Sequence, residues 1–190
     1  MQVFKNFNGK KILVTGHTGF KGTWLSIWLK QLGAKVHGVS FNIPSSPSHF
    51  TEANLSNQIE DHRLDIRDAD SLAELVRKIQ PDFVFHLAAQ ALVRPSYENP
   101  LETITTNALG TANLLDALRG LDKHVVAIMI TSDKAYDNVE WVWGYRETDR
   151  LGGKDPYSAS KGMAELVIRS YVESFFNSSN SNIRIGIARA

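Results

Sequence analysis

The sequence contains no cysteine, which excludes disulfide bonds and thiolate metal sites. Its 21 basic and 20 acidic residues give a net charge of +1, which excludes the charge excess typical of nucleic-acid and anionic-membrane binding. No apolar run approaches the roughly 20 residues of a membrane span, and the first residues lack a secretory leader. The histidines show no paired metal-ligand spacing. We therefore expect a cytoplasmic protein without a metal.

The 190 residues suffice for one hydrophobic core, so we expect a single domain over 1–190. Short apolar runs alternate with amphipathic stretches along the chain. The runs predict strands over 10–16, 34–41, 59–66, 82–89, 124–130 and 182–190, and the amphipathic stretches predict helices over 20–32, 68–80, 98–120 and 155–176. Continuous apolar strands that alternate with helices are typical of a parallel sheet covered on both faces. The predicted fold is α/β, a doubly wound parallel sheet whose site lies at the carboxyl ends of the strands.

A glycine-rich turn, TGHTGFKG, joins the first strand to the first helix. Binding of a dinucleotide would require the three glycines in turn to form a tight turn, to let the backbone approach a pyrophosphate, and to let the helix pack closely on the strand. The helix N–H groups would receive the phosphates. The spacing is GxxGxxG rather than GxGxxG, and a turn without a ligand is the alternative. The residues predicted to hold a dinucleotide here are Gly16, Thr18, Gly19, Phe20 and Gly22.

The acidic residue that usually grips the ribose about 20 residues later is missing. The second strand ends in VSFN, so Ser40 and Asn42 would have to serve. No arginine stands there to hold a 2′-phosphate, which favours NAD over NADP. Further predicted contacts are Asp65 and Ile66 with the adenine and Leu87, Ala88 and Ala89 along the fourth strand, with a purely structural role as the alternative.

Tyr157 and Lys161 stand four residues apart in a predicted helix and therefore share one face. A phenol, with a pKa of about 10, is a poor base at neutral pH. A nearby ammonium and a cationic nicotinamide would both favour the phenolate. Such a tyrosine can take a proton from a sugar hydroxyl while hydride leaves the same carbon. The alternative is a surface pair at the start of a helix.

Three polar residues, Ser132, Asp133 and Lys134, end the apolar strand HVVAIMI. A hydroxyl, a carboxylate and an amine at one strand tip suggest proton transfer, and a solvated pair beginning a turn is the alternative. Gln90 and Asn107 are further candidates for contact with a substrate. His86, inside an apolar strand, is predicted to be a core residue with its hydrogen bonds made within the fold.

Four motifs, TGHTGFKG, HLAAQALVRPSY, NALGTANLLDA and YSASK, resemble the extended short-chain dehydrogenase/reductase family. More narrowly, TSDKAYDN followed by WVWGYRETDRLGGKDPYSASK resembles the CDP-glucose 4,6-dehydratases. The resemblance implies a Rossmann domain that carries bound NAD, and a smaller carboxyl-terminal domain that holds the sugar nucleotide. Residues 1–190 would be the NAD-binding domain, with the substrate domain absent and expected beyond residue 190.

The resemblance also implies an activity, the NAD-dependent dehydration of CDP-D-glucose to CDP-4-dehydro-6-deoxy-D-glucose in deoxysugar synthesis for lipopolysaccharide. Tyr157 would be the base at the 4-hydroxyl, with Lys161 beside it, and Ser132 would hydrogen-bond the 4-oxygen. Asp133 would be the acid and Lys134 the base of the elimination. Adjacent carboxylate and amine groups normally settle as an ion pair, so we expect a closed, water-poor site to bring their pKa values together.

Other functions stay open at this point. One is a different nucleotide-sugar 4,6-dehydratase or a 4-epimerase; another is a module that only binds a dinucleotide. An epimerase needs no acid and base for elimination, so Asp133 followed by Lys134 favours the dehydratase. The resemblance implies a homodimer formed through the helices over 98–119 and 157–176. The Trp141–Tyr145 segment could be a flap over the sugar or a surface that packs on a partner.

Overall fold

A single six-stranded sheet forms the centre of the computed structural model, which describes residues 6–178 and 181–190. Residues 1–5, part of the stretch searched for a leader, lie outside the described residues. The strands are β1 (Lys11–Thr15), β2 (Lys35–Ser40), β3 (Glu60–Arg63), β4 (Phe83–His86), β5 (Val125–Thr131) and β6 (Ile183–Arg189). They lie in the order β3-β2-β1-β4-β5-β6, and all are parallel. This is the predicted doubly wound sheet, with its switch point between β1 and β4.

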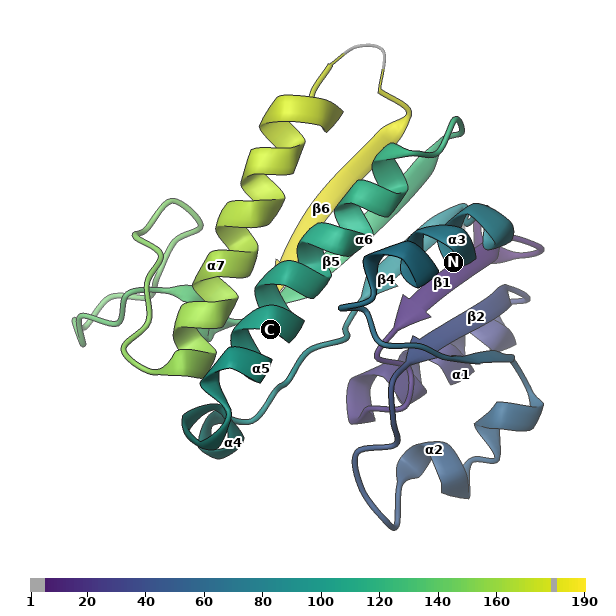
Figure 1. Ribbon diagram of the computed structural model, residues 1–190, viewed down its shortest axis with the longest axis horizontal. Coiled ribbons are helices and arrows are strands. Elements are labelled where there is room, and N and C mark those ends of the chain that lie inside the picture. The colour runs from purple at the N-terminus through teal and green to yellow at the C-terminus, as the bar shows by residue number, and fades with distance from the viewer. Residues whose placement is uncertain (1–5, 179–180) are drawn as a thin grey trace.

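Helices connect the strands and pack on the sheet (Figure 1). They are α1 (Phe20–Gln31), α2 (His49–Glu52), α3 (Ala69–Ile79), α4 (Val93–Glu98), α5 (Pro100–Ile104), α6 (Gly110–Arg119) and α7 (Pro156–Tyr171). Five-residue π-helical turns follow α5 and α7, over Thr105–Leu109 and Val172–Phe176. Helical backbone is therefore continuous over 100–119, in agreement with the predicted helix over 98–120, with a π-helical turn in its middle, and α2 and α4 were not predicted.

The third and fourth strands are shorter than the sequence predicts. β3 ends at Arg63, opposite the last residue of its partner β2, and β4 ends at His86, opposite the last residue of β1, although β5 on its other side continues to Thr131. The last ladder contacts are the hydrogen bonds from Leu64 N to the Ser40 carbonyl and from Leu87 N to the Thr15 carbonyl. The residues that follow β3 and β4 are released from the sheet at its carboxyl edge, where the predicted site lies.

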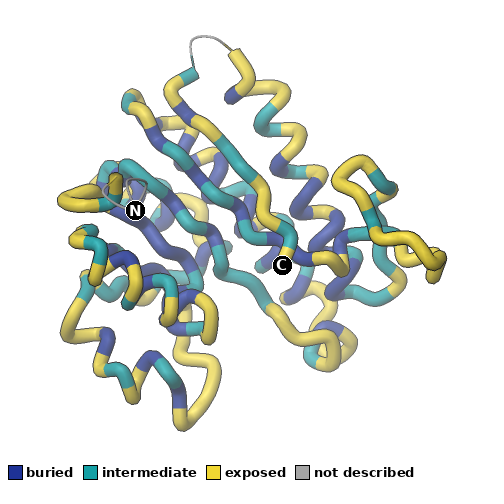
Figure 2. Tube along the Cα trace, turned by 180° about the vertical axis from the view of Figure 1, so that it is seen from behind, coloured by how far each residue is buried: buried dark blue, intermediate teal, exposed yellow. Residues whose placement is uncertain are grey.

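The hydrophobic core has two parts, one on each face of the sheet (Figure 2). Side chains alternate along β1, so Leu13 packs with α3, α6 and α7 while Ile12 and Val14 pack with Leu29 of α1. The second face is covered less completely over β5, where Val126, Ile128 and Ile130 stay half-buried. Within the described ranges, no helix is long and apolar enough to cross a membrane, and no group of side chains could hold a metal ion.

Candidate active site at the carboxyl edge of the sheet

The glycine-rich turn brings three backbone segments into contact. Gly16 has a φ of +76°, and a Cβ added to it would stand 2.6 Å from the Ala88 nitrogen. A Cβ on Gly22 would overlap the Gly16 carbonyl. The turn thus packs against both the start of α1 and the residues after β4, a geometry only glycine permits at Gly16. It leaves backbone, rather than side chains, at the mouth of the site.

The amino end of α1 has no side-chain cap, in contrast to α2, α3 and α7. Asp68 accepts a hydrogen bond from Ser71 N at the start of α3, and Asp155 accepts one from Ser158 N at the start of α7. Gly19 caps α1 without a side-chain hydrogen bond, and the first turn holds no acidic residue. The free N–H groups and the positive end of the helix dipole therefore fit an anion such as a pyrophosphate.

A buried hydrogen-bond network around His17 lies beneath the turn and was not predicted from the sequence. His17 is fully buried, with Nε2 2.9 Å from Asp61 Oδ1 and Nδ1 3.0 Å from Ser40 Oγ. Burial lowers the pKa of His17 despite the opposing effect of Asp61, so its ring is neutral. Since the carboxylate can only accept, Nε2 carries the proton and Nδ1 accepts from the Ser40 hydroxyl. Ser40, the last residue of β2, also accepts a hydrogen bond from Thr18 N at 3.4 Å, which leaves one acceptor lone pair on its hydroxyl.

The residues predicted to contact the adenine and the fourth strand lie in the segments just after β3 and β4. Both Asp65 oxygens accept hydrogen bonds from Arg67 at 2.6–3.0 Å, which lower the pKa of Asp65. Ile66 is buried against Gly110. Leu87, Ala88 and Ala89 are half-buried, and Ala88 N donates to Thr15 Oγ1 at 3.2 Å.

His86 is the satisfied core histidine that the sequence predicts. Its Nδ1 lies 2.7 Å from Thr15 Oγ1, and its Nε2 lies 3.1 Å from Thr111 Oγ1. Because Thr111 donates to the Asn107 carbonyl, it accepts from Nε2–H, and Nδ1 accepts from Thr15. Burial lowers the pKa of His86 to about 3, so the ring is neutral. The chain of hydrogen bonds ties β1 and β4 to the π-helical turn.

Gln90 and Asn107, the two candidates for substrate contact, are hydrogen-bonded to each other. Asn107 accepts from Gln90 N at 2.8 Å and donates to the Gln90 carbonyl at 3.0 Å and to Ser160 Oγ at 2.8 Å. The Gln90 side chain bonds Leu92 and Thr103. In this structure the Asn107 amide fixes Gln90 to the π-helical turn and, through Ser160, to α7, while the Gln90 amide fixes its own segment to α5.

Tyr157 and Lys161 lie on the first two turns of α7, 9% and 7% exposed. Gly153 packs so closely on Ser158 that an added Cβ would overlap it, which fixes the start of the helix. Among the described residues, neither the Tyr157 hydroxyl nor the Lys161 amine has a hydrogen-bond or ion-pair partner. Burial, with a smaller effect from Lys21, lowers the pKa of Lys161 to about 8. These two groups keep their polar atoms available for a ligand.

Replacing Lys161 by methionine should stabilise the cofactor-free chain at pH 7. At pH 7 the amine is charged in the folded chain, and burying this charge costs free energy. Between the folded pKa of about 8 and the unfolded value of 10.5, only the unfolded chain binds the proton. The free energy of unfolding of the wild type should thus rise with pH across this window. The difference between the two pKa values corresponds to a total rise of about 3 kcal/mol. Urea unfolding at pH 7 and pH 10 measures both effects, with exposed Lys154→Met as the control.

If Lys161→Met and Lys154→Met changed the free energy of unfolding equally at both pH values, the buried amine would carry no such cost.

The tip of β5 presents Ser132 buried and its two neighbours exposed. Ser132 Oγ donates to Asp133 Oδ1 at 3.1 Å and accepts from Lys134 N at 3.2 Å, which closes the short turn Asp133–Ala135. Within the described chain, Asp133 and Lys134 form no ion pair with each other. The Ala135 carbonyl accepts from Gly152 N at 2.9 Å, which holds the turn at the side of α7.

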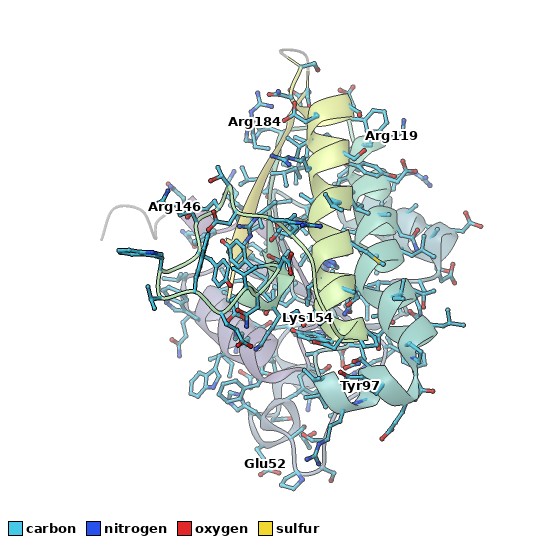
Figure 3. The ribbon with its side chains drawn as sticks, turned by 90° about the vertical axis from the view of Figure 1, so that its left-hand side faces the viewer. Glu52, Tyr97, Arg119, Arg146, Lys154 and Arg184 are labelled. Atoms are coloured by element: carbon cyan, nitrogen blue, oxygen red, sulfur yellow. The ribbon has the colours of Figure 1, made fainter. Side chains whose placement is uncertain are left out.

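The Trp141–Tyr145 segment lies on an arm that projects beside α7 (Figure 3). Trp141 and Trp143 are exposed. Tyr145 stacks on Tyr136 at 5.0 Å, and its hydroxyl accepts from Val139 N at 2.8 Å. A single antiparallel bridge, Tyr136 with Leu151, closes the base of the arm, so it is a loop rather than a β-hairpin.

A family profile described as GDP-mannose 4,6 dehydratase matches residues 13–184. The chain belongs to this family. It is 51% identical to the CDP-glucose 4,6-dehydratase of Salmonella typhimurium over 93% of its length and 49% of that protein. It is 32% identical to a GDP-mannose 4,6-dehydratase of Yersinia enterocolitica, over 87% and 46% of the two chains. These matches confirm the resemblance inferred from the motifs.

Solved structures of the family's wider group share the fold. An epimerase from Methanothermobacter thermautotrophicus superposes with a TM-score of 0.84 at 26% identity, covering all of this chain and 53% of its own. UDP-glucose 4-epimerase from Brucella ovis, in complex with NAD, gives 0.79 at 25% identity, over 95% and 51%. The Rossmann fold is thereby confirmed. The chain spans about half the length of the relatives that it matches.

Proposed function

We propose that this chain is the NAD-binding part of a CDP-glucose 4,6-dehydratase. The full-length protein would convert CDP-D-glucose to CDP-4-dehydro-6-deoxy-D-glucose and water, as a cytoplasmic step in deoxysugar supply for lipopolysaccharide. The observation that carries the proposal is the tip of β5. It joins a buried hydroxyl to an adjacent carboxylate and amine, beside a helix whose Tyr157 and Lys161 have unused polar atoms. The 51% identity to a CDP-glucose 4,6-dehydratase supports the choice of substrate.

NAD fits the residues present. The uncapped start of α1 and the Gly16–Gly22 turn would receive its pyrophosphate, and Lys161 would meet the nicotinamide ribose. Ser40 offers a ligand only an acceptor lone pair, because its proton goes to His17 and Thr18 N occupies its other lone pair. An acceptor suits a ribose hydroxyl and repels a 2′-phosphate, which supports NAD over NADP. When bound, NAD supplies a hydride acceptor that is regenerated within the same cycle.

The side chains divide the proton transfers between them. Tyr157, as phenolate beside the Lys161 ammonium, takes the proton of the 4-hydroxyl, while Ser132 hydrogen-bonds the 4-oxygen. The ketone at C4 acidifies the C5 proton, which Lys134 removes. Asp133 protonates the 6-hydroxyl as it leaves, so one water is lost across C5–C6. Lys134 then returns a proton to C5 as C6 receives the hydride that left C4. The proton that Tyr157 took replaces, through solvent, the one that Asp133 gave up.

Lys134 must be a neutral amine and Asp133 a protonated acid for these roles. Both side chains are exposed to water in this structure. We propose that the bound sugar displaces this water. Desolvation raises the pKa of an acid and lowers that of an amine, so it brings both groups toward the states that elimination needs.

The experiment that tests the function is an incubation of the full-length protein with CDP-, dTDP-, GDP- and UDP-glucose. We expect a 4-keto-6-deoxy product from CDP-glucose, detected by NMR. Product from another nucleotide alone would change the assigned base. A 4-epimer, as the names of several similar structures would suggest, or no turnover at all would remove the dehydratase proposal.

We also propose a homodimer built on the face that α5, the π-helical turn and α7 present to solvent. Large apolar side chains are exposed on these elements. They are Leu101, Leu109 and Met163, with Phe175 in the π-helical turn that follows α7. Such side chains on long neighbouring helices are typical of a helix-bundle interface.

A further inference from the structure

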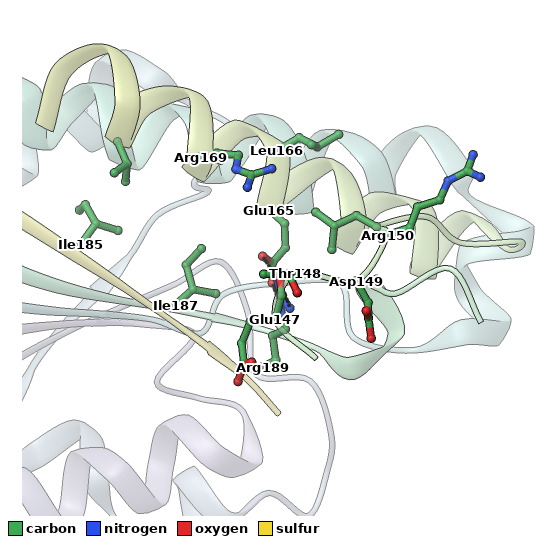
Figure 4. A pocket seen from close by; sticks show the side chains of 12 residues that line it. Glu147, Thr148, Asp149, Arg150, Glu165, Leu166, Arg169, Ile185, Ile187 and Arg189 are labelled. Carbon is green, nitrogen blue, oxygen red and sulfur yellow. Dashed lines mark hydrogen bonds and ion pairs between the residues drawn. The ribbon is translucent and has the colours of Figure 1, made fainter. Parts of the chain in front are cut away.

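A buried ion pair lies one helical turn beyond Lys161. Glu165 of α7 is 3% exposed, and its two oxygens accept from Arg189 Nε at 2.7 Å and Arg189 Nη2 at 2.8 Å. Figure 4 shows the two side chains reaching toward each other from α7 and β6. Burial alone would raise the pKa of Glu165, but the hydrogen bonds from Arg189 and Thr131 hold it below its ordinary value. The pair is therefore charged, and each partner is needed to neutralise the other.

This pair contacts the chain on both sides of the proposed catalytic turn. The Thr131 hydroxyl, directly before Ser132, donates to Glu165 Oε1 at 2.5 Å. The Arg189 guanidinium donates to the Tyr136 hydroxyl at 2.6 Å and lies over the Tyr136 ring at 4.7 Å. Tyr136 comes directly after the turn. One ion pair thus holds residues 131 and 136, which bracket Ser132, Asp133 and Lys134.

Arg189 also extends this hold to the arm. Its Nη1 donates to the Glu147 carbonyl at 3.2 Å, so the returning part of the arm over 137–150 is held by the same guanidinium. Thr131 and Arg189 stand opposite each other in the β5–β6 register. The contacts therefore join β5, β6, α7 and the arm at a single point.

We propose that Glu165 and Arg189 are positioning residues for the elimination step, because they fix the Asp133–Lys134 turn relative to the helix that carries Tyr157 and Lys161. The inference rests on the proposed dehydratase function. Glu165 follows Lys161 by four residues and shares its face of α7. In the described structure the Lys134 amine makes no hydrogen bond or ion pair and has only an electrostatic interaction with Asp155, so the two bracketed ends of the turn largely determine where it lies.

The two chemical stages depend on this pair to different degrees. Oxidation at C4 uses Tyr157 and Lys161, which α7 holds through its own backbone, and only one group of the bracketed turn, the Ser132 hydroxyl, which directly follows Thr131. Removal of the C5 proton uses Lys134, at the middle of the bracketed turn. Loosening the bracket should therefore slow elimination more than oxidation, and reduced nicotinamide should accumulate in the enzyme.

The test is Glu165→Gln in the full-length protein loaded with NAD and given CDP-glucose. The amide keeps the size of the side chain but loses its charge. We expect kcat for dehydration to fall roughly 10- to 100-fold, the effect of a displacement of about 1 Å, with little change in KM. The distinguishing signature is absorbance of reduced nicotinamide during turnover, absent in the wild type.

Two further variants distinguish a loss of positioning from a general loss of stability. Tyr136→Phe removes one hydrogen bond of the bracket and should give the same signature more weakly. Asp82→Asn breaks the contacts with Lys11 N and Lys123 at 2.9 Å each, at the opposite edge of the sheet. This control should lower stability without any accumulation of reduced nicotinamide.

Loss of turnover in Glu165→Gln without reduced nicotinamide, or the same signature in Asp82→Asn, would overturn the positioning role. If Glu165→Gln does not fold, wild-type behaviour of Tyr136→Phe would overturn it. Failure of the wild type on every nucleotide sugar would instead refute the proposed function, a distinguishable result.

Discussion

Replacing Lys134 by alanine is expected to block the loss of water while oxidation at C4 continues. Lys134 is the group proposed to remove the C5 proton, and in the described chain its amine serves no hydrogen bond that folding requires. Loss of a positioned general base costs about 10²- to 10⁴-fold in rate, so product formation should fall by that factor. Tyr157 and Lys161 remain, so absorbance of reduced nicotinamide should rise on mixing with CDP-glucose, and NMR should show little 4-keto-6-deoxy product.

The controls for this experiment lie nearby in the chain. Lys154→Ala removes another exposed lysine, close to the start of α7, and should leave both stages unchanged. Tyr157→Phe removes the proposed base at C4 and should abolish both reduced nicotinamide and product. If Lys134→Ala reduced both stages equally, Lys134 would act in oxidation or binding rather than in elimination. The amount of reduced nicotinamide that accumulates in Lys134→Ala is also the value against which Glu165→Gln is compared.

The parts of the fold that follow from local chemistry were predictable from the sequence. Apolar runs and helix periodicity place the strands and the long helices, and Asp68 and Asp155 cap α3 and α7 as their types favour. The glycine spacing correctly indicates a turn that packs closely on α1. The spacing of Tyr157 and Lys161 placed both on one face of α7, since this depends only on helical geometry.

The polar networks that hold the site could not be predicted, because their partners are distant in sequence. His17 and Asp61 are 44 residues apart, and Glu165 and Arg189 are 24 apart. Local patterns also assign charged side chains to the surface, whereas Glu165 and His17 are buried. One signal was present: Gly38 lies inside β2, and a Cβ there would overlap the His17 ring. A glycine within a strand often marks such an approach.

The strand and helix ends depend on neighbours as well. The sequence predicts apolar continuations of β3 and β4, but the edge strand β3 can continue only while its partner β2 does. Ser40 ends β2, so Asp65 lies outside the sheet. β4 leaves the sheet where β1 ends, although β5 continues to Thr131, and Ala88 N donates to Thr15 Oγ1 instead. The same limit brings these segments to the carboxyl edge beside the glycine-rich turn.

Replacing Gly16 by alanine is expected to disrupt both the fold and dinucleotide binding. The substitution places a Cβ at a φ of +76°, which costs about 1–2 kcal/mol, and 2.6 Å from the Ala88 nitrogen, where overpacking adds roughly 1–3 kcal/mol. The nearest atoms are backbone, so no side chain can rotate away. The turn or the 87–89 segment must shift, and the N–H groups proposed to meet the pyrophosphate would shift with it. Urea unfolding and calorimetric titration with NAD measure the two losses.

Gly9 provides the matched control for this prediction. Its φ is +72°, but nothing lies within 4 Å of an added Cβ. Gly9→Ala therefore carries the backbone cost of about 1–2 kcal/mol alone and should bind NAD like the wild type. We expect Gly16→Ala to lose clearly more stability and at least roughly 100-fold in NAD affinity, since a displaced backbone site forfeits several hydrogen bonds. Equal losses of stability in the two variants would mean that conformation, and not the close approach to Ala88, requires glycine at position 16.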